Sequence, residues 1–132
     1  MASLFSRIVN GEIPCYKIAE NKDCLAFLDI NPLVKGHVLV IPKKEVDYIF
    51  DLDDQLYQSL WLFSKQVSHA IKKAIPCKRI GIAVIGLEVP HAHIHLIPMN
   101  RVSDMNFASP KLSLSKEELQ EVAEKISKEF TG

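Results

Sequence analysis

The chain has 132 residues, of which 48% are hydrophobic, and its 16 Lys and Arg residues balance its 16 Asp and Glu residues. This length suits one domain over residues 1–132, and the hydrophobic content is too high for a disordered chain. The charge balance argues against a nucleic-acid partner, and no apolar run approaches the roughly 20 residues of a membrane span.

The first part of the chain predicts a short helix and three strands. Ser3 can cap a helix that ends near Gly11, and Pro14 prevents its continuation. The predicted strands cover residues 16–20, 24–30 and 37–42. The turn sequence Asn21-Lys22-Asp23 joins the first two strands into a hairpin.

The strongest helix signal lies in the middle of the chain, from Asp53 to Ile75. Apolar residues recur there at steps of three and four, which describes one buried face. These residues are Leu56, Leu60, Phe63, Val67, Ile71 and Ala74. A second stripe of Tyr57, Trp61 and Ser64 lies beside them and has two interpretations, a wide core face or a subunit interface.

The last part of the chain predicts two more strands and a helix. The strands cover residues 79–85 and 91–98, and the short turn between them suits antiparallel neighbours. Residues 100–114 are polar and predict a surface loop, whereas Ser115 with Glu118 predicts the capping box of a final helix. This order of elements indicates an α+β fold around a five-stranded antiparallel sheet.

Three of the five histidines alternate within the strand predicted over residues 91–98. Successive side chains of a strand point to opposite faces, so His91, His93 and His95 share one face. The residues Ala92, Ile94 and Leu96 then point to the core. A helix would scatter the same histidines over about 200° of its surface.

The residues leave three interpretations of the histidine face open. Neutral imidazoles bind zinc, and His37 is a candidate further ligand, but no cysteine lies beside the motif. Histidines without chemistry are a second interpretation, which alternation over three positions disfavours. The third is chemistry at phosphorus, in which the middle imidazole attacks a phosphoryl group and its neighbours donate hydrogen bonds to the phosphate oxygens.

Four blocks of the sequence resemble the histidine triad (HIT) superfamily. The segment His91-Ala92-His93-Ile94-His95-Leu96-Ile97 matches the family's His-φ-His-φ-His-φ-φ signature, in which φ is an apolar residue. Residues 4–14 (LFSRIVNGEIP), 24–32 (CLAFLDINP) and 36–43 (GHVLVIPK) resemble three further blocks in the family's order. The resemblance covers about residues 3–98, and a C-terminal loop and helix over about residues 99–132 lie outside it.

The resemblance implies a nucleotide hydrolase or transferase of the Hint branch, of nucleoside phosphoramidase or dinucleoside polyphosphate hydrolase type. Such enzymes cleave a nucleoside monophosphate from an amine or a second phosphate group through a covalent nucleotidyl-histidine. The resemblance also implies a purine nucleotide as the bound small molecule, no cofactor, and a homodimer whose sheets join into one of ten strands. The alternative is a nucleotide-binding regulatory protein with little or no turnover.

The same resemblance assigns roles to individual residues. His93 is the implied nucleophile and His95 the contact to the transferred phosphate, while His37 and His91 are implied to set orientation and tautomer. Asp29 falls at the position that binds the ribose hydroxyls, although a carboxylate there also suits a cap of the following turn. The base-pocket positions hold Leu4, Phe5, Ile8, Ile13 and Ile30, apolar residues that an amphipathic opening segment also buries.

Three departures from the family pattern bear on the site. Ser3 and Ser6 stand where many prokaryotic members carry a Cys-x-x-Cys zinc site, and serine is a poor zinc ligand, so we expect no metal. Glu88 stands where a hydroxyl contacts phosphate. A carboxylate there either acts as acid or base for an unusual leaving group or turns outward. The segment after Asn100 does not match, which leaves the substrate least constrained.

Cysteine usage predicts the compartment. Cys15, Cys24 and Cys77 are odd in number, widely spaced and form no CxxC pair, which is typical of reduced thiols. The first residues lack the order of a secretory signal, in which basic residues precede a long apolar run and a cleavage site. We therefore expect a cytoplasmic protein.

Overall fold

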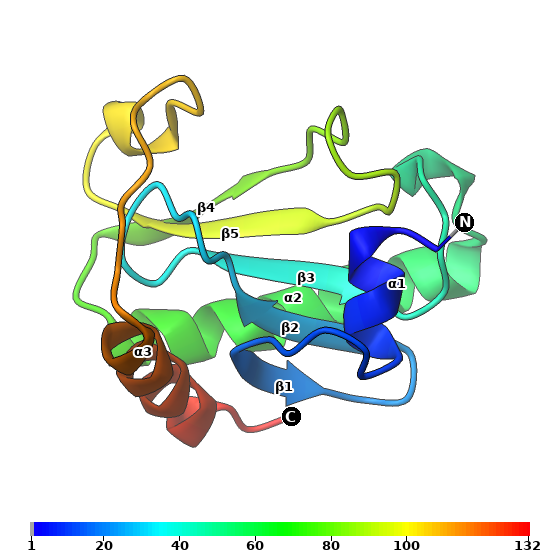
Figure 1. The fold of residues 1–132 in the computed structure, drawn as a ribbon, viewed down its shortest axis with the longest axis horizontal. Coiled ribbons are helices and arrows are strands. Elements are labelled where there is room, and N and C mark those ends of the chain that lie inside the picture. Colours follow the sequence, from blue (N-terminus) through cyan, green and yellow to red (C-terminus); the bar gives the residue numbers. More distant parts are fainter. Residues whose placement is uncertain (1) are drawn as a thin grey trace.

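The computed structural model describes residues 2–132 and contains a five-stranded antiparallel sheet with three α-helices (Figure 1). The strands are β1 (Lys17–Glu20), β2 (Cys24–Leu28), β3 (Val38–Pro42), β4 (Arg79–Ala83) and β5 (Ile94–Met99). The α-helices are α1 (Leu4–Val9), α2 (Asp54–Ala74) and α3 (Lys116–Glu129), and the 3-10 helices η1 (Ile49–Asp51) and η2 (Val102–Met105) precede α2 and α3. The order across the sheet is β1-β2-β3-β5-β4, which confirms the predicted fold class.

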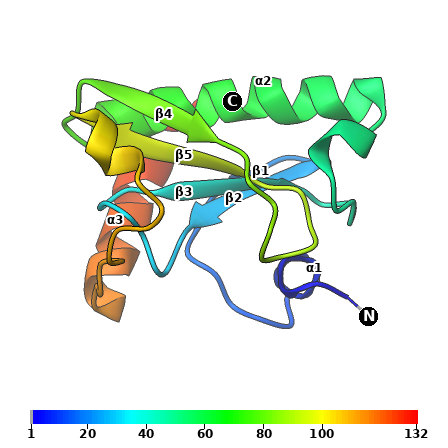
Figure 2. The same ribbon diagram turned by 90° about the horizontal axis from the view of Figure 1, so that it is seen from above.

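Helices lie on both faces of the sheet, with α2 along one face and α1 across the other (Figure 2). Residues of α2, α3 and the sheet form the main core. The α1 face carries a smaller cluster of Phe5, Leu25, Phe27, Leu39 and Ile41. Because side chains alternate along a strand, β2 and β3 contribute to both clusters, which explains their nearly continuous apolar sequences.

The predicted helix starts are confirmed. Ser3, Asp53 and Ser115 are the N-caps of α1, α2 and α3, and each side chain accepts a hydrogen bond from the backbone N–H three residues later. The buried face of α2 includes Leu60, Phe63, Val67 and Ile71, as predicted. Tyr57 and Trp61 are half-buried at its margin. Within residues 2–132, no helix has both the length and the apolar character needed to cross a membrane.

The strand predicted over residues 91–98 starts later than expected, because β5 begins at Ile94. The ladder between β3 and β5 ends at the pair Val40 and Ile94. Two residues further along β3 stands Pro42, which has no N–H to donate, so the ladder cannot continue in this register. His91 and His93 therefore lie in an irregular segment before the strand, which corrects the prediction.

The alternation of side chains nevertheless persists through this segment. The N–H of Ala92 donates to the carbonyl of Val46 at 2.7 Å, which holds the chain against the core. Of the residues that alternate here, Ala92, Ile94 and Leu96 are buried in the main core. The rings of His91 and His93 pack instead against Phe5 of α1. The predicted division into a histidine face and a core face is confirmed.

Candidate active site

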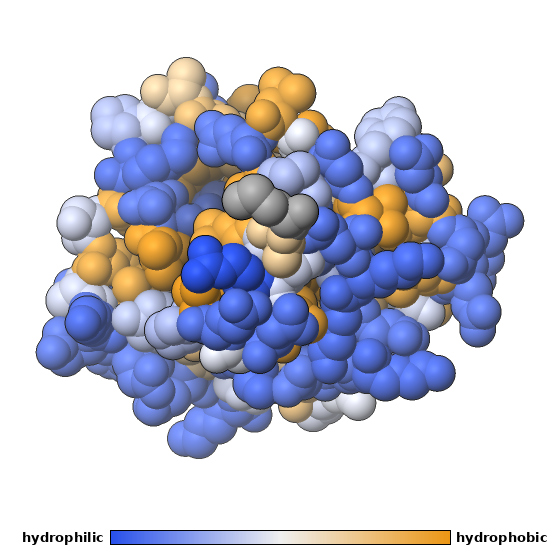
Figure 3. Space-filling model, turned by 45° about the vertical axis from the view of Figure 1, so that its right-hand side comes forward, coloured by the Kyte–Doolittle hydropathy of each residue, from blue (hydrophilic) through white to orange (hydrophobic). Residues whose placement is uncertain are grey.

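A pocket of about 490 Å³ lies on the α1 face, with walls from α1, the ends of β2 and β3, and the loop after β4. Apolar residues (orange) gather in patches among hydrophilic ones (blue) on the side of the molecule that Figure 3 shows. The residues expected to bind nucleotide, Leu4, Phe5, Ile8, Ile13, Asp29, Ile30 and Glu88, all line this pocket. His37, His93 and His95 line it as well, whereas His91 lies outside it.

The hydrogen bond of His93 determines which of its ring nitrogens carries a proton. Nδ1 lies 2.7 Å from the backbone oxygen of His91. A carbonyl oxygen can only accept, so Nδ1 is the donor, and in the neutral ring the lone pair is at Nε2. The ring is 7% exposed and packs edge-on against Phe5 at 5.0 Å between centroids. Two contacts thus hold the orientation of the His93 ring, and its neutral form has a lone pair at Nε2.

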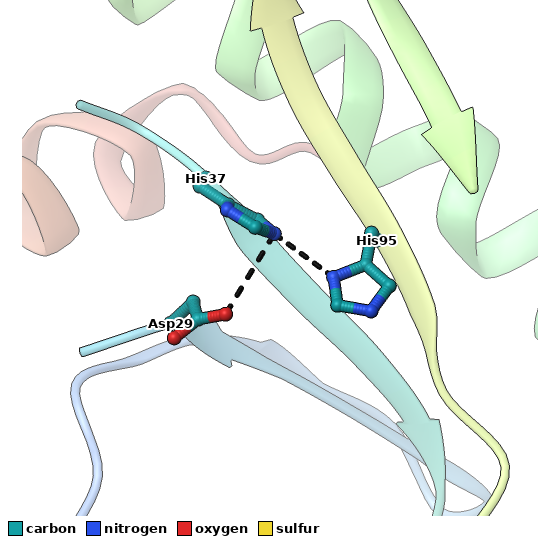
Figure 4. A group of neighbouring side chains, drawn as sticks. All are labelled: Asp29, His37 and His95. Atoms are coloured by element: carbon teal, nitrogen blue, oxygen red, sulfur yellow. Dashed lines mark hydrogen bonds and ion pairs between the residues drawn. The ribbon is translucent and has the colours of Figure 1, made fainter. Parts of the chain in front are cut away.

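Two successive hydrogen bonds determine the tautomer of His95, and the one between His37 and His95 is drawn in Figure 4. The N–H of Leu33 donates to His37 Nδ1 at 3.1 Å, so the proton of neutral His37 is at Nε2. That Nε2 lies 2.9 Å from His95 Nδ1 and donates to it. His95 therefore carries its proton at Nε2, as a hydrogen-bond donor. Burial lowers the pKa of His37 to about 3 and that of His95 to about 4, so both rings are neutral at pH 7.

Asp29 caps a turn and also lines the pocket. Its Oδ1 accepts from the N–H of Asn31 at 2.9 Å, which is the capping interpretation of this residue. Its Oδ2 lies 3.7 Å from His37 Nε2, too far for a hydrogen bond. Burial raises the pKa of this carboxyl group. One oxygen is thus used by the turn, and the other retains acceptor capacity.

The same side chains bring three potential metal-ligand atoms within 4.8 Å of one another, from Asp29, His37 and His95. The hydrogen-bond directions do not fit a metal ion there. The N–H of Leu33 holds the lone pair of His37 at Nδ1 and leaves a proton at Nε2, whereas a metal needs a lone pair from each ligand. The cluster is a hydrogen-bonded pair of rings beside a carboxylate.

His91 is fully buried between β3 and α1. Its Nε2 lies 2.7 Å from the carbonyl oxygen of Pro42 and must donate to it. Burial lowers the pKa of His91, which favours the neutral ring with a lone pair at Nδ1, and Ser3 Oγ lies 3.1 Å from that nitrogen. The residue that ends the β3 ladder therefore also positions the first histidine of the motif.

Glu45 completes this network. Its Oε1 accepts from the hydroxyl of Ser6 and from the N–H of Ser3, both at 2.6 Å. These bonds, that of Ser6 first, lower the pKa of Glu45 to about 2. Because the Ser6 proton is directed to Glu45, the Ser3 hydroxyl is the donor to His91. Two hydroxyls, a carboxylate and one imidazole do not match the Cys and His donors of a structural zinc site.

Two residues at the pocket escaped the sequence prediction. The ring of Phe107 packs edge-on against His95 at 4.8 Å between centroids and lies 6.2 Å from His37. Lys111 also lines the pocket. Both belong to the segment predicted as a surface loop. An isolated aromatic residue in a polar stretch was the only sequence signal for this contact.

The comparisons with known proteins agree on one family. The family model of the HIT domain matches residues 10–102. The chain is 36% identical over 129 residues to adenosine 5'-monophosphoramidase hnt1 of Schizosaccharomyces pombe, covering 96% of this chain and 97% of that protein. It is 33% identical over 114 residues to adenylylsulfatase HINT3 of Arabidopsis thaliana, covering 83% of this chain and 57% of that protein. Among solved structures, a HIT-like protein from Bartonella henselae matches with a TM-score of 0.85 at 28% identity, covering 97% of this chain and 96% of that chain.

Proposed function

We propose that this chain, which belongs to the HIT family, is a nucleotide hydrolase or transferase that cleaves a nucleoside monophosphate from an amine or phosphate leaving group. The proposal rests on two neighbouring imidazole rings in the pocket, one with a lone pair at Nε2 and the other with a proton at Nε2. His93 offers a lone pair at Nε2, and its neighbour His95 offers a proton at Nε2. A phosphoryl group needs both, a nucleophile for phosphorus and a donor for its oxygens.

In the proposed reaction, His93 Nε2 attacks phosphorus while the bond from phosphorus to the leaving group breaks. The leaving group departs with the bonding electrons and takes up a proton. The positive charge that develops on the ring is stabilised by the His91 carbonyl, which accepts from Nδ1. His95 donates from Nε2 to a phosphoryl oxygen. A water molecule then attacks phosphorus, and the bond from phosphorus to Nε2 breaks with its electrons returning to the ring, so that His93 is again the neutral imidazole. The proton that the water loses goes to solvent and balances the one that the leaving group took up.

The pocket composition supports a nucleoside as the bound group. Leu4 and Ile30 are 48% and 58% exposed where they line the pocket, so apolar surface is available there for a base to cover. With Ile8 and Ile13 they form a wall suited to a purine base. The Oδ2 atom of Asp29 suits the ribose hydroxyls, because a carboxylate accepts from two adjacent donors.

Incubation with adenosine 5'-phosphoramidate tests this function. We expect release of AMP and ammonia, and a covalent adenylyl adduct detectable by mass spectrometry after rapid denaturation. A protein that binds AMP in calorimetry, yet releases none from the amidate and from dinucleoside polyphosphates, would instead be the nucleotide-binding regulator.

Replacement of Glu45 by alanine is expected to lower kcat/KM by about 10-fold and to lower the midpoint of thermal unfolding. The N–H of Ser3 and the hydroxyl of Ser6 lose their shared acceptor, so the start of α1 is no longer held beside His91. Glu45→Gln is the matched control, because its amide oxygen still accepts, and it should retain most of the activity. Steady-state kinetics that match the wild type for Glu45→Ala would exclude this positioning role.

We also infer a homodimer formed through β4, which is an edge strand with β5 as its neighbour. Ile82 is 53% exposed on this strand, and Val84 is 37% exposed just after it. Sedimentation should give twice the chain mass of 14.9 kDa. Ile82→Arg should yield a monomer, because the guanidinium would be buried without a partner at the joined edge. Gln120→Arg, at an exposed residue of α3 beside the opposite edge strand β1, is the control. A monomeric wild type would refute the inference.

We further infer that the chain functions as one domain in the cytoplasm. α3 lies outside the matched family segment, but its residues Leu119, Val122 and Ile126 join the main core with α2. Cys15, Cys24 and Cys77 are free thiols, which suits a reducing compartment.

A further inference from the structure

The pocket contains little positive charge for a ligand that carries phosphate. His37 and His95 are neutral at pH 7, mainly because they are buried. Asp29 and Glu88 add carboxylates to the lining. Of the residues that line the pocket within the described range 2–132, Lys111 is the single lysine or arginine. Among the lining side chains other than histidine, a cationic contact to the ligand therefore depends on Lys111.

Lys111 belongs to a segment that is held in place, which we call the C-terminal strap (residues 106–112). The N–H of Leu112 donates to the carbonyl of Pro32 at 2.8 Å, in the loop before β3. The side chain and the carbonyl of Asn106 close a turn by accepting from the next residues. At the pocket, Phe107 packs on His95. The strap is thus fastened at both ends beside the histidines.

The ammonium group of Lys111 retains both its charge and a free donor. Nζ donates to the carbonyl oxygens of Phe107 at 2.6 Å and of Ser109 at 3.3 Å. An ammonium group has three donors, so one is left for a ligand. Across residues 2–132, the ion pairs do not include Lys111, so its charge is not neutralised by a carboxylate. This charge also contributes to the lowered pKa values of His37 and His95, after burial and the neighbouring histidine in each case.

Four rings form a row that orders the pocket from α1 to the strap. Phe5 lies 5.0 Å from His93, His93 lies 5.0 Å from His95, and His95 lies 4.8 Å from Phe107, measured between centroids. The apolar wall stands at the Phe5 end. With the base on that wall and phosphorus over His93 and His95, the group beyond phosphorus lies toward Phe107 and Lys111.

We propose that Lys111 binds negative charge on the leaving group, so that this chain favours nucleotides whose leaving group is a sulfate or phosphate over those that release an amine. The inference rests on the proposed function for its chemistry. Lys111 stabilises the charge that accumulates on the departing oxygen as its bond to phosphorus breaks. Glu88, on the loop after β4, opposes this effect at the same pocket, because its carboxylate repels an anionic leaving group.

The test compares two adenylyl donors that differ in the leaving group, adenosine 5'-phosphosulfate and adenosine 5'-phosphoramidate. Lys111→Met should reduce kcat/KM by about 30-fold for the phosphosulfate and by less than about 3-fold for the amidate, because a hydrogen bond to a charged group is lost with one substrate. Lys111→Arg should restore most of the loss, since it keeps the charge. Glu88→Gln should raise kcat/KM for the phosphosulfate. Lys125→Met, an exposed lysine on α3, is the control for charge removal.

Equal losses of kcat/KM on both substrates would overturn the proposal, because Lys111 would then contact the phosphate that the two substrates share. The absence of any loss would also overturn it. If the wild type turned over neither donor, the proposed function would fail, and binding would decide the inference separately. Calorimetry should then show that Lys111→Met weakens the binding of ADP by about 10-fold and the binding of AMP by much less. If the substitution weakened the binding of ADP and AMP equally, or weakened neither, a contact of Lys111 beyond the first phosphate would be refuted.

Discussion

Replacement of His93 by alanine is expected to reduce release of AMP from adenosine 5'-phosphoramidate by at least about 10⁴-fold and to abolish the adenylyl adduct. His93 Nε2 is the unprotonated ring nitrogen that follows from the 2.7 Å bond between Nδ1 and the His91 carbonyl. Its neighbour His95 presents a proton at the corresponding atom and cannot substitute as the attacking group. The measurements are the single-turnover rate and intact-protein mass after rapid mixing.

His69→Ala is the matched control, because His69 is an exposed histidine on α2, on the opposite face of the sheet. It should retain wild-type rates and adduct yield. An adduct that persists at full yield in His93→Ala would show that another group is the nucleophile. Binding of AMP by His93→Ala separates loss of chemistry from loss of the pocket.

Acidification below pH 6.5 is expected to destabilise the fold, because the buried neutral rings of His37 and His95 take up protons more readily when the chain is unfolded. His37 and His95 have folded pKa values of about 3 and about 4, below the 6.5 of an unfolded chain. Between pH 6.5 and 4.5 the unfolded state therefore binds more protons than the folded state, and stability falls as pH falls. The combined loss over this window is about 3–5 kcal/mol. The raised pKa of Asp29 acts in the opposite direction and reduces the total.

Denaturant unfolding at a series of pH values measures this dependence. The free energy of unfolding should decline from pH 6.5 to 4.5 in the wild type. It should decline less steeply in His37→Gln, which removes one of the three buried rings, those of His37, His91 and His95, whose pKa values burial lowers. His69→Gln should keep the wild-type slope, since that side chain is exposed. A wild-type stability that is constant across the window would contradict the buried, neutral state of the rings.

The parts of the fold that sequence could predict are those set by local patterns. The spacing of apolar residues identified α2 and its buried face, and capping residues located three helix starts. Alternation assigned Ala92 and Ile94 to the core although the strand begins only at Ile94. The strand boundary itself depended on Pro42 in a different strand, a pairing that no local pattern reveals.

The candidate site divides in the same way. Most of the residues singled out from the quoted blocks line one pocket, and each of these blocks has a recognisable pattern. Their roles remain predictions. Glu45, Phe107 and Lys111 reach the site or its supporting network through contacts between segments distant in sequence. A charged residue after a strand and an aromatic residue in a polar loop have many other uses. Only the folded arrangement distinguishes these three from ordinary surface positions.

The hydrogen-bond directions around His93 and His95 also bear on how the site reacts to substrate. In water, an imidazole exchanges between two tautomers, and the surrounding water dipoles must reorient before it can act as a nucleophile. Here the backbone groups of Leu33 and His91 made that selection when the chain folded. For the proposed attack by His93, we therefore expect a small reorganisation energy in the chemical step, because the dipoles around the two rings are already oriented.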